Sequence, residues 1–184
     1  MTDPRSSLTH RIMTANPHAY KALVVHGTTP ALAMKLLDGV TSSQLFDAPT
    51  STAHADGALA GLWLWHDGLA ESHAISQSMH DATGSFWHAI MHRREGDFSN
   101  SKYWYAKVGR HAAIDILAAQ AGAIVGDMPA DKSILRIVVR GFDPNALVDL
   151  VEQVHDEPTD PRYAAAVRLQ QLEWRVLFDF CMRG

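Results

Sequence analysis

The chain has 184 residues, of which 47% are hydrophobic and 20% are charged, and this composition excludes wholesale disorder. The formal net charge of −4 leaves no basic surplus for phosphate groups, so we expect no nucleic-acid partner. A lone cysteine excludes an internal disulfide, the N-terminus lacks a signal-peptide pattern, and the apolar stretches are too short for a bilayer. We therefore expect a cytoplasmic protein without membrane association.

The spacing of apolar residues predicts an all-α, single-domain bundle of about six to seven helices over residues 1–184. Residues 1–27 have a mixed pattern and are expected to form a loosely packed N-terminal segment. A Thr-Thr-Pro start and a terminal glycine predict a helix over residues 28–39. The Ser- and Thr-rich residues 41–56 predict a loop with one brief turn.

Two helices joined by a short loop are predicted at the centre of the chain. Asp56 is the expected cap of a long helix that reaches Met79, because apolar residues recur there at helical spacing. Ser85 is the expected cap of a second helix, which ends at Gly96. Connected by residues 80–84, these helices would form a central antiparallel hairpin.

Four further helices are expected towards the C-terminus, over residues 102–108, 111–125, 143–155 and 161–181. Residues 134–140 are the one strand-like segment, because β-branched residues cluster there. This segment has no evident partner strand. We therefore expect an extended connection or the end of a helix.

Ionisable residues gather in the predicted hairpin. His66 and His73 are seven positions apart, nearly two helical turns, and should share an inward-facing stripe. His88 and His92 are four positions apart on the second helix, and Glu95 follows on the same face. Packing of the two helices should bring these five side chains together.

Imidazole and carboxylate groups suit one divalent ion of zinc, iron, nickel or manganese. At about 1.5 Å of rise per residue, His66 and His73 are about 10 Å apart along the helix, whereas His88 and His92 are about 6 Å apart. The predicted metal site therefore uses His88 and His92 with His66, His73 or Glu95. The H-x-x-x-H pair lacks the glutamate that follows the first histidine in zinc proteases.

Other residues around the cluster are candidates for catalysis and ligand binding. The groups proposed for acid–base or electrostatic catalysis are His66, His73, Arg94 and Glu95. The groups expected to contact a small-molecule ligand are Asp67, Glu71, Trp87, Arg93 and Trp104. The two arginines would bind an anionic ligand. Asp67 and Glu71 are also candidates for salt bridges to these arginines.

Two sequence blocks carry a resemblance to a family of uncharacterised bacterial proteins. The blocks are H-D-x-L-x-E-S-H, over residues 66–73, and W-H-x-I-M-H-R-R-E-G-D, over residues 87–97. The resemblance covers roughly two-thirds of the chain, implies a helical fold and brings no function. Residues 92–109 are also similar to one hairpin of a tetratricopeptide or Sel1-type repeat, but a single unit predicts no solenoid.

Three interpretations of the central cluster stay open: a metal site, a metal-free pocket, and a buried polar network. We favour an enzyme or ligand-binding protein, because buried charge is often no better for stability than apolar packing. The alternative is a helical interaction protein in which the cluster is structural. Trp63 and Trp65 lie about 200° apart on a helix, so one of them would then face a homodimer partner or a pocket.

Overall fold

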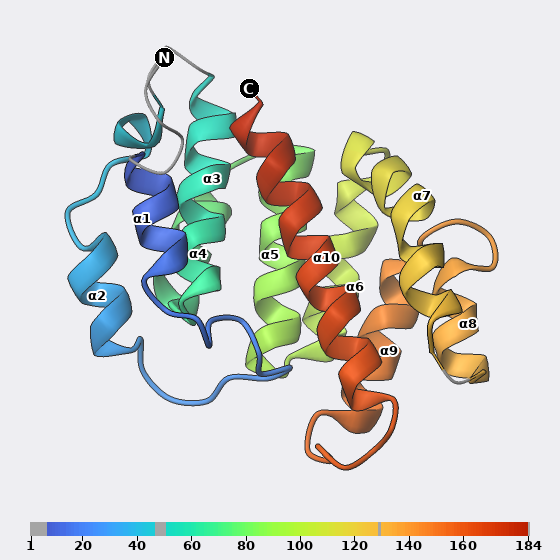
Figure 1. The fold of residues 1–184 in the computed structure, drawn as a ribbon. Helices are drawn as coiled ribbons and strands as arrows, with labels where there is room; N and C mark the ends of the chain where they lie inside the picture. Colours follow the sequence, from blue (N-terminus) through green and yellow to red (C-terminus); the bar gives the residue numbers. More distant parts are fainter. Residues whose placement is uncertain (1–6, 47–50, 129, 184) are drawn as a thin grey trace.

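The computed structural model describes residues 7–46, 51–128 and 130–183, and this part of the chain is all-helical, without a β-strand (Figure 1). The fold class is thus as expected, but ten α-helices replace the expected six or seven. The α-helices are α1 (Leu8–Thr14), α2 (Ala31–Leu37), α3 (Thr52–Trp65), α4 (Leu69–Ser78), α5 (Ala82–Glu95), α6 (Phe98–Val108), α7 (Ala112–Gly126), α8 (Lys132–Val138), α9 (Pro144–Val154) and α10 (Tyr163–Met182). A 3₁₀ helix, η2, covers Ser42–Leu45.

The long helix α10 packs against α3 and α7 (Figure 1). Tryptophan side chains make contacts between α3, α5 and α10. Trp87 and Trp174 are almost completely buried, and the Trp174 indole donates a hydrogen bond to the carbonyl of Gly61 at 2.8 Å. A Cβ atom at Gly61 would lie 2.8 Å from the Trp87 ring. Glycine is therefore required where α3 meets α5.

The first arm of the expected hairpin is two helices instead of one. It begins at Thr52, after the Ser51 cap, so Asp56 is not its start. The arm breaks after Trp65, and α4 begins at Leu69. Asp67 adopts a left-handed backbone conformation at the break (φ 64°), which a continuous helix does not allow.

The helices α5 and α6 both begin earlier than predicted, because aspartates cap them. The Asp81 carboxylate accepts a hydrogen bond from the Gly84 amide at 2.7 Å, so Ser85 is not the cap of α5. Asp97 caps α6 in the same way, through the amide of Asn100. The expected end of α5 is confirmed, since Gly96 is left-handed at φ 87°.

Residues 134–138 of the strand-like segment form the end of helix α8, which was one of the two expected alternatives. Asp131 caps this helix by accepting hydrogen bonds from the amides of Ser133 and Ile134. Ile134 and Ile137 share one face of the helix and are buried. Packing against the core therefore overrides the β-propensity of these residues.

The N-terminal segment, which was expected to be loosely packed, contacts the bundle within residues 7–25. Tyr20 and Leu23 are completely buried. The Gln170 side chain of α10 donates a hydrogen bond to the Ala22 carbonyl at 2.9 Å, and the Trp65 indole donates to the Met13 carbonyl at 3.1 Å. Residues 1–6 lie outside the described residues.

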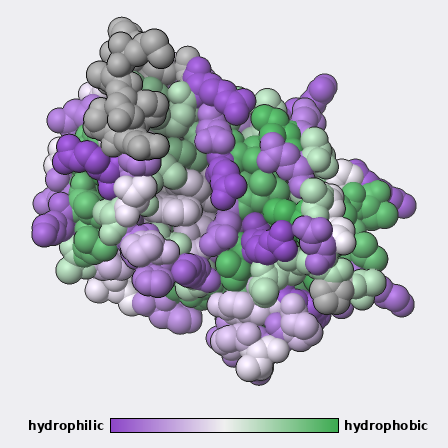
Figure 2. All heavy atoms as spheres, in the orientation of Figure 1, coloured by the Kyte–Doolittle hydropathy of each residue, from purple (hydrophilic) through white to green (hydrophobic). Residues whose placement is uncertain are grey.

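The aromatic side chains mostly pack against other residues of the same chain. Trp63 is buried, and Trp65 stacks on Tyr20 and lies 4.4 Å, centre to centre, from the Trp174 ring. Both tryptophans thus pack within the chain, and Trp65 stays partly exposed. The face shown in Figure 2 mixes hydrophilic and hydrophobic residues, and no described helix is long and apolar enough to cross a membrane.

Candidate functional site

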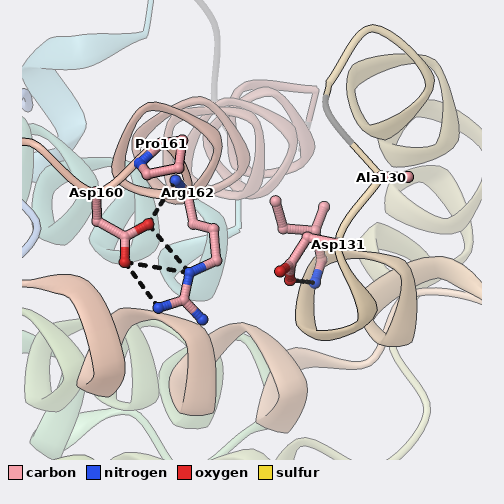
Figure 3. A pocket seen from close by; sticks show the side chains of 6 residues that line it. Ala130, Asp131, Asp160, Pro161 and Arg162 are labelled. Atoms are coloured by element: carbon pink, nitrogen blue, oxygen red, sulfur yellow. Dashed lines mark hydrogen bonds and ion pairs between the residues drawn. The ribbon is translucent and has the colours of Figure 1, made fainter.

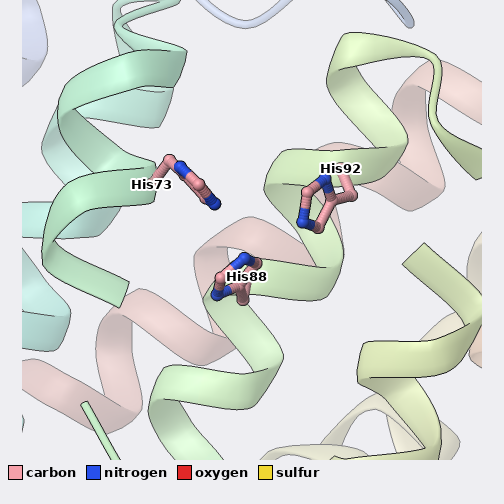
Figure 4. Close-up of side chains that lie close together, drawn as sticks. All are labelled: His73, His88 and His92. Carbon is pink, nitrogen blue, oxygen red and sulfur yellow. The ribbon is translucent and has the colours of Figure 1, made fainter. Parts of the chain in front are cut away.

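Three histidines from two helices converge on one point (Figure 4). His88 and His92 lie one turn apart on α5, and α4 supplies His73 from the other side. One ring nitrogen from each residue lies within 4.8 Å of the other two. His88 and His92 are buried, with 2% and 6% of their surface exposed, whereas His73 is partly exposed. The cluster thus lies at the edge of the core, with one member open to solvent.

Aromatic packing fixes the orientation of the His88 ring. The Trp104 indole of α6 stacks on it at 3.9 Å between ring centres and an angle of 13°. His73 meets it edge-on at 4.6 Å, and His92 lies at 4.7 Å. Trp104 therefore forms a wall of the histidine cluster and limits rotation of His88.

Burial keeps two of the histidines neutral. Burial, followed by the proximity of His92 and His73, lowers the pKa of His88 to about 4. Burial, followed by the proximity of His92, also lowers the pKa of His73 below its ordinary value. Both rings consequently carry a free lone pair at neutral pH, which is the form that binds metal ions.

The His92 ring is oriented by Glu95. The Nδ1 atom of His92 lies 2.7 Å from a carboxylate oxygen of Glu95, and as the donor of this hydrogen bond it leaves the lone pair on Nε2. The Asn100 amide nitrogen lies 3.1 Å from Nε2. A carboxylate that orients a histidine in this way is the usual second partner of a metal-binding imidazole.

One buried nitrogen in the histidine cluster has no hydrogen-bond partner among the described residues. The Nδ1 atom of His88 is buried without a hydrogen bond to any described residue. Buried polar atoms are nearly always paired, and an exception calls for an explanation such as an ion. Three imidazoles, one of them oriented by a carboxylate, are a donor set that fits a divalent metal ion.

The break between α3 and α4 separates His66 from this cluster. Its Nε2 donates a hydrogen bond to the Ile12 carbonyl at 2.9 Å, so His66 ties the N-terminal segment to α3. Arg94 lies in the same region, where it pairs with Asp67 at 2.7 Å and covers the Tyr20 ring at 3.9 Å. His66, Asp67 and Arg94, which the sequence placed at the site, therefore form a second network that holds the N-terminal segment.

Three more of the predicted ligand-binding residues lie outside the cluster. Arg93 is completely buried and pairs with Glu173 of α10, while Trp87 lies in the core. Glu71 accepts a hydrogen bond from the Thr29 hydroxyl. Of the residues predicted for the site, the structure gathers only a subset: His73, His88, His92, Glu95 and Trp104.

Sequence reasoning missed Asn100 and Glu173. Asn100 was expected in a turn, but it lies in the first turn of α6, where its side chain reaches His92. Glu173 is 80 positions from Arg93 in the chain, so only the fold could connect them. The signal available in the sequence was a glutamate directly between Leu172 and Trp174 in the predicted last helix, since a charged residue among core positions needs a partner.

Comparison of the chain with protein-family models, with curated proteins and with solved structures gives no match. The geometry of the histidine cluster is therefore the main indication of function.

Proposed function

We propose that the protein binds one divalent metal ion through His73, His88 and His92, and that it is a metal-dependent enzyme or ligand-binding protein acting on a small molecule. The convergence of three ring nitrogens within 4.8 Å carries this proposal. The sequence supports His88 and His92 as the core pair, and the structure favours His73 over His66 as the third ligand.

A purely structural role is the competing interpretation of the cluster. It leaves the buried Nδ1 of His88 without a partner among the described residues, as Nδ1 of His66 also is in the second network. His92 is the exception, because Glu95 and Asn100 both contact its ring. The same Glu95 contact also orients a metal ligand, so it does not count against a metal, whereas an ion bound at Nε2 would displace the Asn100 amide.

The cluster needs only small side-chain movements to close around an ion. Tetrahedral zinc with bonds of about 2.0–2.1 Å places its ligand nitrogens about 3.3 Å apart. The nitrogens here lie within 4.8 Å of one another before any ion is added. Rotation of His73, the one partly exposed ring, is the easiest way to draw them together.

A site with three protein ligands leaves a fourth position for water or substrate, as catalytic zinc sites do. A divalent ion in such a position supplies Lewis acidity and lowers the pKa of bound water. The partly exposed His73 marks the side from which a small molecule reaches the cluster. Hydrolysis of a small-molecule substrate is the reaction class we propose, with Trp104 as one wall of the binding site.

Metal content measured by mass spectrometry tests the proposal directly. Untagged protein, purified and then reconstituted with zinc, iron, nickel or manganese, should hold about one equivalent of an ion. His73→Gln and His92→Gln should each lose it, whereas His80→Gln, which changes an exposed histidine outside the cluster, should keep it. Absence of metal after reconstitution with all four ions would reject the proposal and favour the interaction-protein alternative.

Thermal unfolding separates metal loss from misfolding. At a free metal concentration of about 100 times Kd, binding adds about 2.7 kcal/mol to the free energy of unfolding. For a chain of this size the Tm should rise by about 5–11 °C. His73→Gln should lack this rise while keeping the Tm of the metal-free wild type to within a few degrees. Equal rises in both proteins would show that the ion binds elsewhere.

A further inference from the structure

A cavity of about 210 Å³ lies between α7 and α10 and shares no lining residue with the histidine cluster. Its apolar floor comes from Ile124 of α7 and Leu172 of α10. Its polar lining consists of Arg168, Gln171 and Arg175, all from α10. Pockets for drug-sized ligands span about 300–1,000 Å³, so this cavity suits a smaller molecule.

The two arginines project from one face of α10. They are seven positions apart, which is nearly two turns with a drift of about 20°. Gln171 lies between them on the same face. Arg168 and Arg175 start about 10 Å apart along the helix, and their long side chains can converge on a group held between them.

The positive charge of this cavity is largely unmatched. Arg175 has no hydrogen bond or ion pair to any described residue. Arg168 reaches only Asp127, at 3.7 Å, and both side chains are well exposed. Such an exposed, long ion pair contributes little, so an anion can replace it at small cost.

Other cavities of the protein differ in this respect. In the cavity of about 290 Å³ beside α8, Arg162 is held by Asp160 at 2.7 Å (Figure 3). In a third cavity, Arg136 pairs with Asp149 at 3.0 Å. Arg162 and Arg136 are thus paired within the protein, and Asp143 lines the third cavity beside its second arginine, Arg140. Among the described residues, no acidic one lines the cavity between α7 and α10.

We propose that this cavity binds a small phosphomonoester that carries a hydroxyl group. Two guanidinium groups match the two charges and several oxygens of a phosphate group. The Gln171 amide nitrogen is already engaged, since it donates a hydrogen bond to the Tyr20 carbonyl at 3.2 Å. The amide oxygen is left as an acceptor, which suits a ligand hydroxyl, while Ile124 and Leu172 contact the carbon skeleton.

Calorimetric titration with glycerol 3-phosphate tests this site independently of the metal proposal, because the protein is first treated with a chelator. Ionic strength is held constant with chloride. We expect saturable binding, weakened about tenfold or more in Arg168→Gln and in Arg175→Gln, since each removes a charge-assisted contact. Arg110→Gln, which removes the same charge at an exposed position outside the cavity, should bind like the wild type. Thermal melting confirms that the variants are folded.

Two comparisons could overturn the assignment. Methyl phosphate, which has no hydroxyl, should bind more weakly than glycerol 3-phosphate, and equal binding would refute the role of Gln171. Equal weakening in Arg110→Gln, or the absence of saturable binding in the wild type, would refute the site itself. Tighter binding of malate than of glycerol 3-phosphate would refute the assignment to a phosphate group.

Discussion

The buried ion pair between Arg93 and Glu173 gives the sharpest test of the packing of α5 against α10. Both side chains are completely buried, and the Tyr105 hydroxyl donates a hydrogen bond to the other carboxylate oxygen of Glu173 at 2.7 Å. Glu173→Gln keeps the shape and an acceptor for Tyr105, but it leaves the Arg93 charge uncompensated. Removing one partner of such a pair costs about 3–5 kcal/mol. For a chain of this size, the Tm should fall by about 6–20 °C.

Urea and thermal unfolding monitored by circular dichroism measure this loss. Glu157→Gln makes the same chemical change at an exposed position and should shift the Tm by no more than about 1–2 °C. In the Glu173→Gln background, Arg93→Met should cost less than it does in the wild type, by about 1–3 kcal/mol, because the two residues are coupled.

A decrease in Tm for Glu173→Gln as small as that for Glu157→Gln would contradict an uncompensated Arg93 charge in the interior. Strict additivity of the free-energy changes of Glu173→Gln and Arg93→Met would contradict it as well. Either outcome would mean that Arg93 finds water or another partner when the carboxylate is removed. Water would then reach the region between α5 and α10 more easily than the complete burial of both side chains indicates.

Three further predictions concern protonation, close packing and capping. In the metal-free protein, His88 takes up a proton near its ordinary pKa in the unfolded chain but only at a pKa of about 4 in the folded protein. The free energy of unfolding, measured in urea, should therefore decrease by about 1–2 kcal/mol as the pH falls from about 6.5 to about 4; solvent near the partly exposed His73 keeps the decrease this small. His88→Gln should lack this pH-dependent decrease. Gly61→Ala should lower the free energy of unfolding by about 1–3 kcal/mol, since the new Cβ would lie 2.8 Å from the Trp87 ring. Gly122→Ala on α7 has nothing within 4 Å of its Cβ and should raise the free energy of unfolding by about 0.5–1 kcal/mol. Equal effects of the two variants would contradict the close contact between α3 and α5. Asp81→Ala should lower the Tm by about 2–4 °C through loss of the α5 cap, and an unchanged Tm would show that the cap is dispensable.

The helices whose start and stop signals lie in the local sequence were predictable. Gly96 ends α5 and Asp143 starts α9, as the glycine and the Asp-Pro pair indicated. The break at Asp67 was not predictable, because the apolar spacing continues through it. Asp67 is held there by an ion pair with Arg94, which is 27 positions away in the chain, so the break depends on the tertiary structure.

The candidate site was predictable where it depended on one helix. His88, His92 and Glu95 lie on one face of α5 because their spacing is four and three, and no tertiary information is needed. The choice between His66 and His73 was beyond the sequence, since the break turns His66 towards Ile12 and leaves His73 opposite His88. A uniform seven-residue stripe was therefore the wrong geometry for these two histidines.

The density of charged residues at the end of α5 reflects three different neighbours of that helix. Successive residues are about 100° apart, so His92 faces the histidine cluster, Arg93 faces Glu173 of α10, and Arg94 faces Asp67 and the N-terminal segment. Because α5 is enclosed by other elements, each direction needs its own polar partner. Residues adjacent in sequence on such a helix belong to different environments, and only those spaced by about one or two whole turns, as His88, His92 and Glu95 are, share one face.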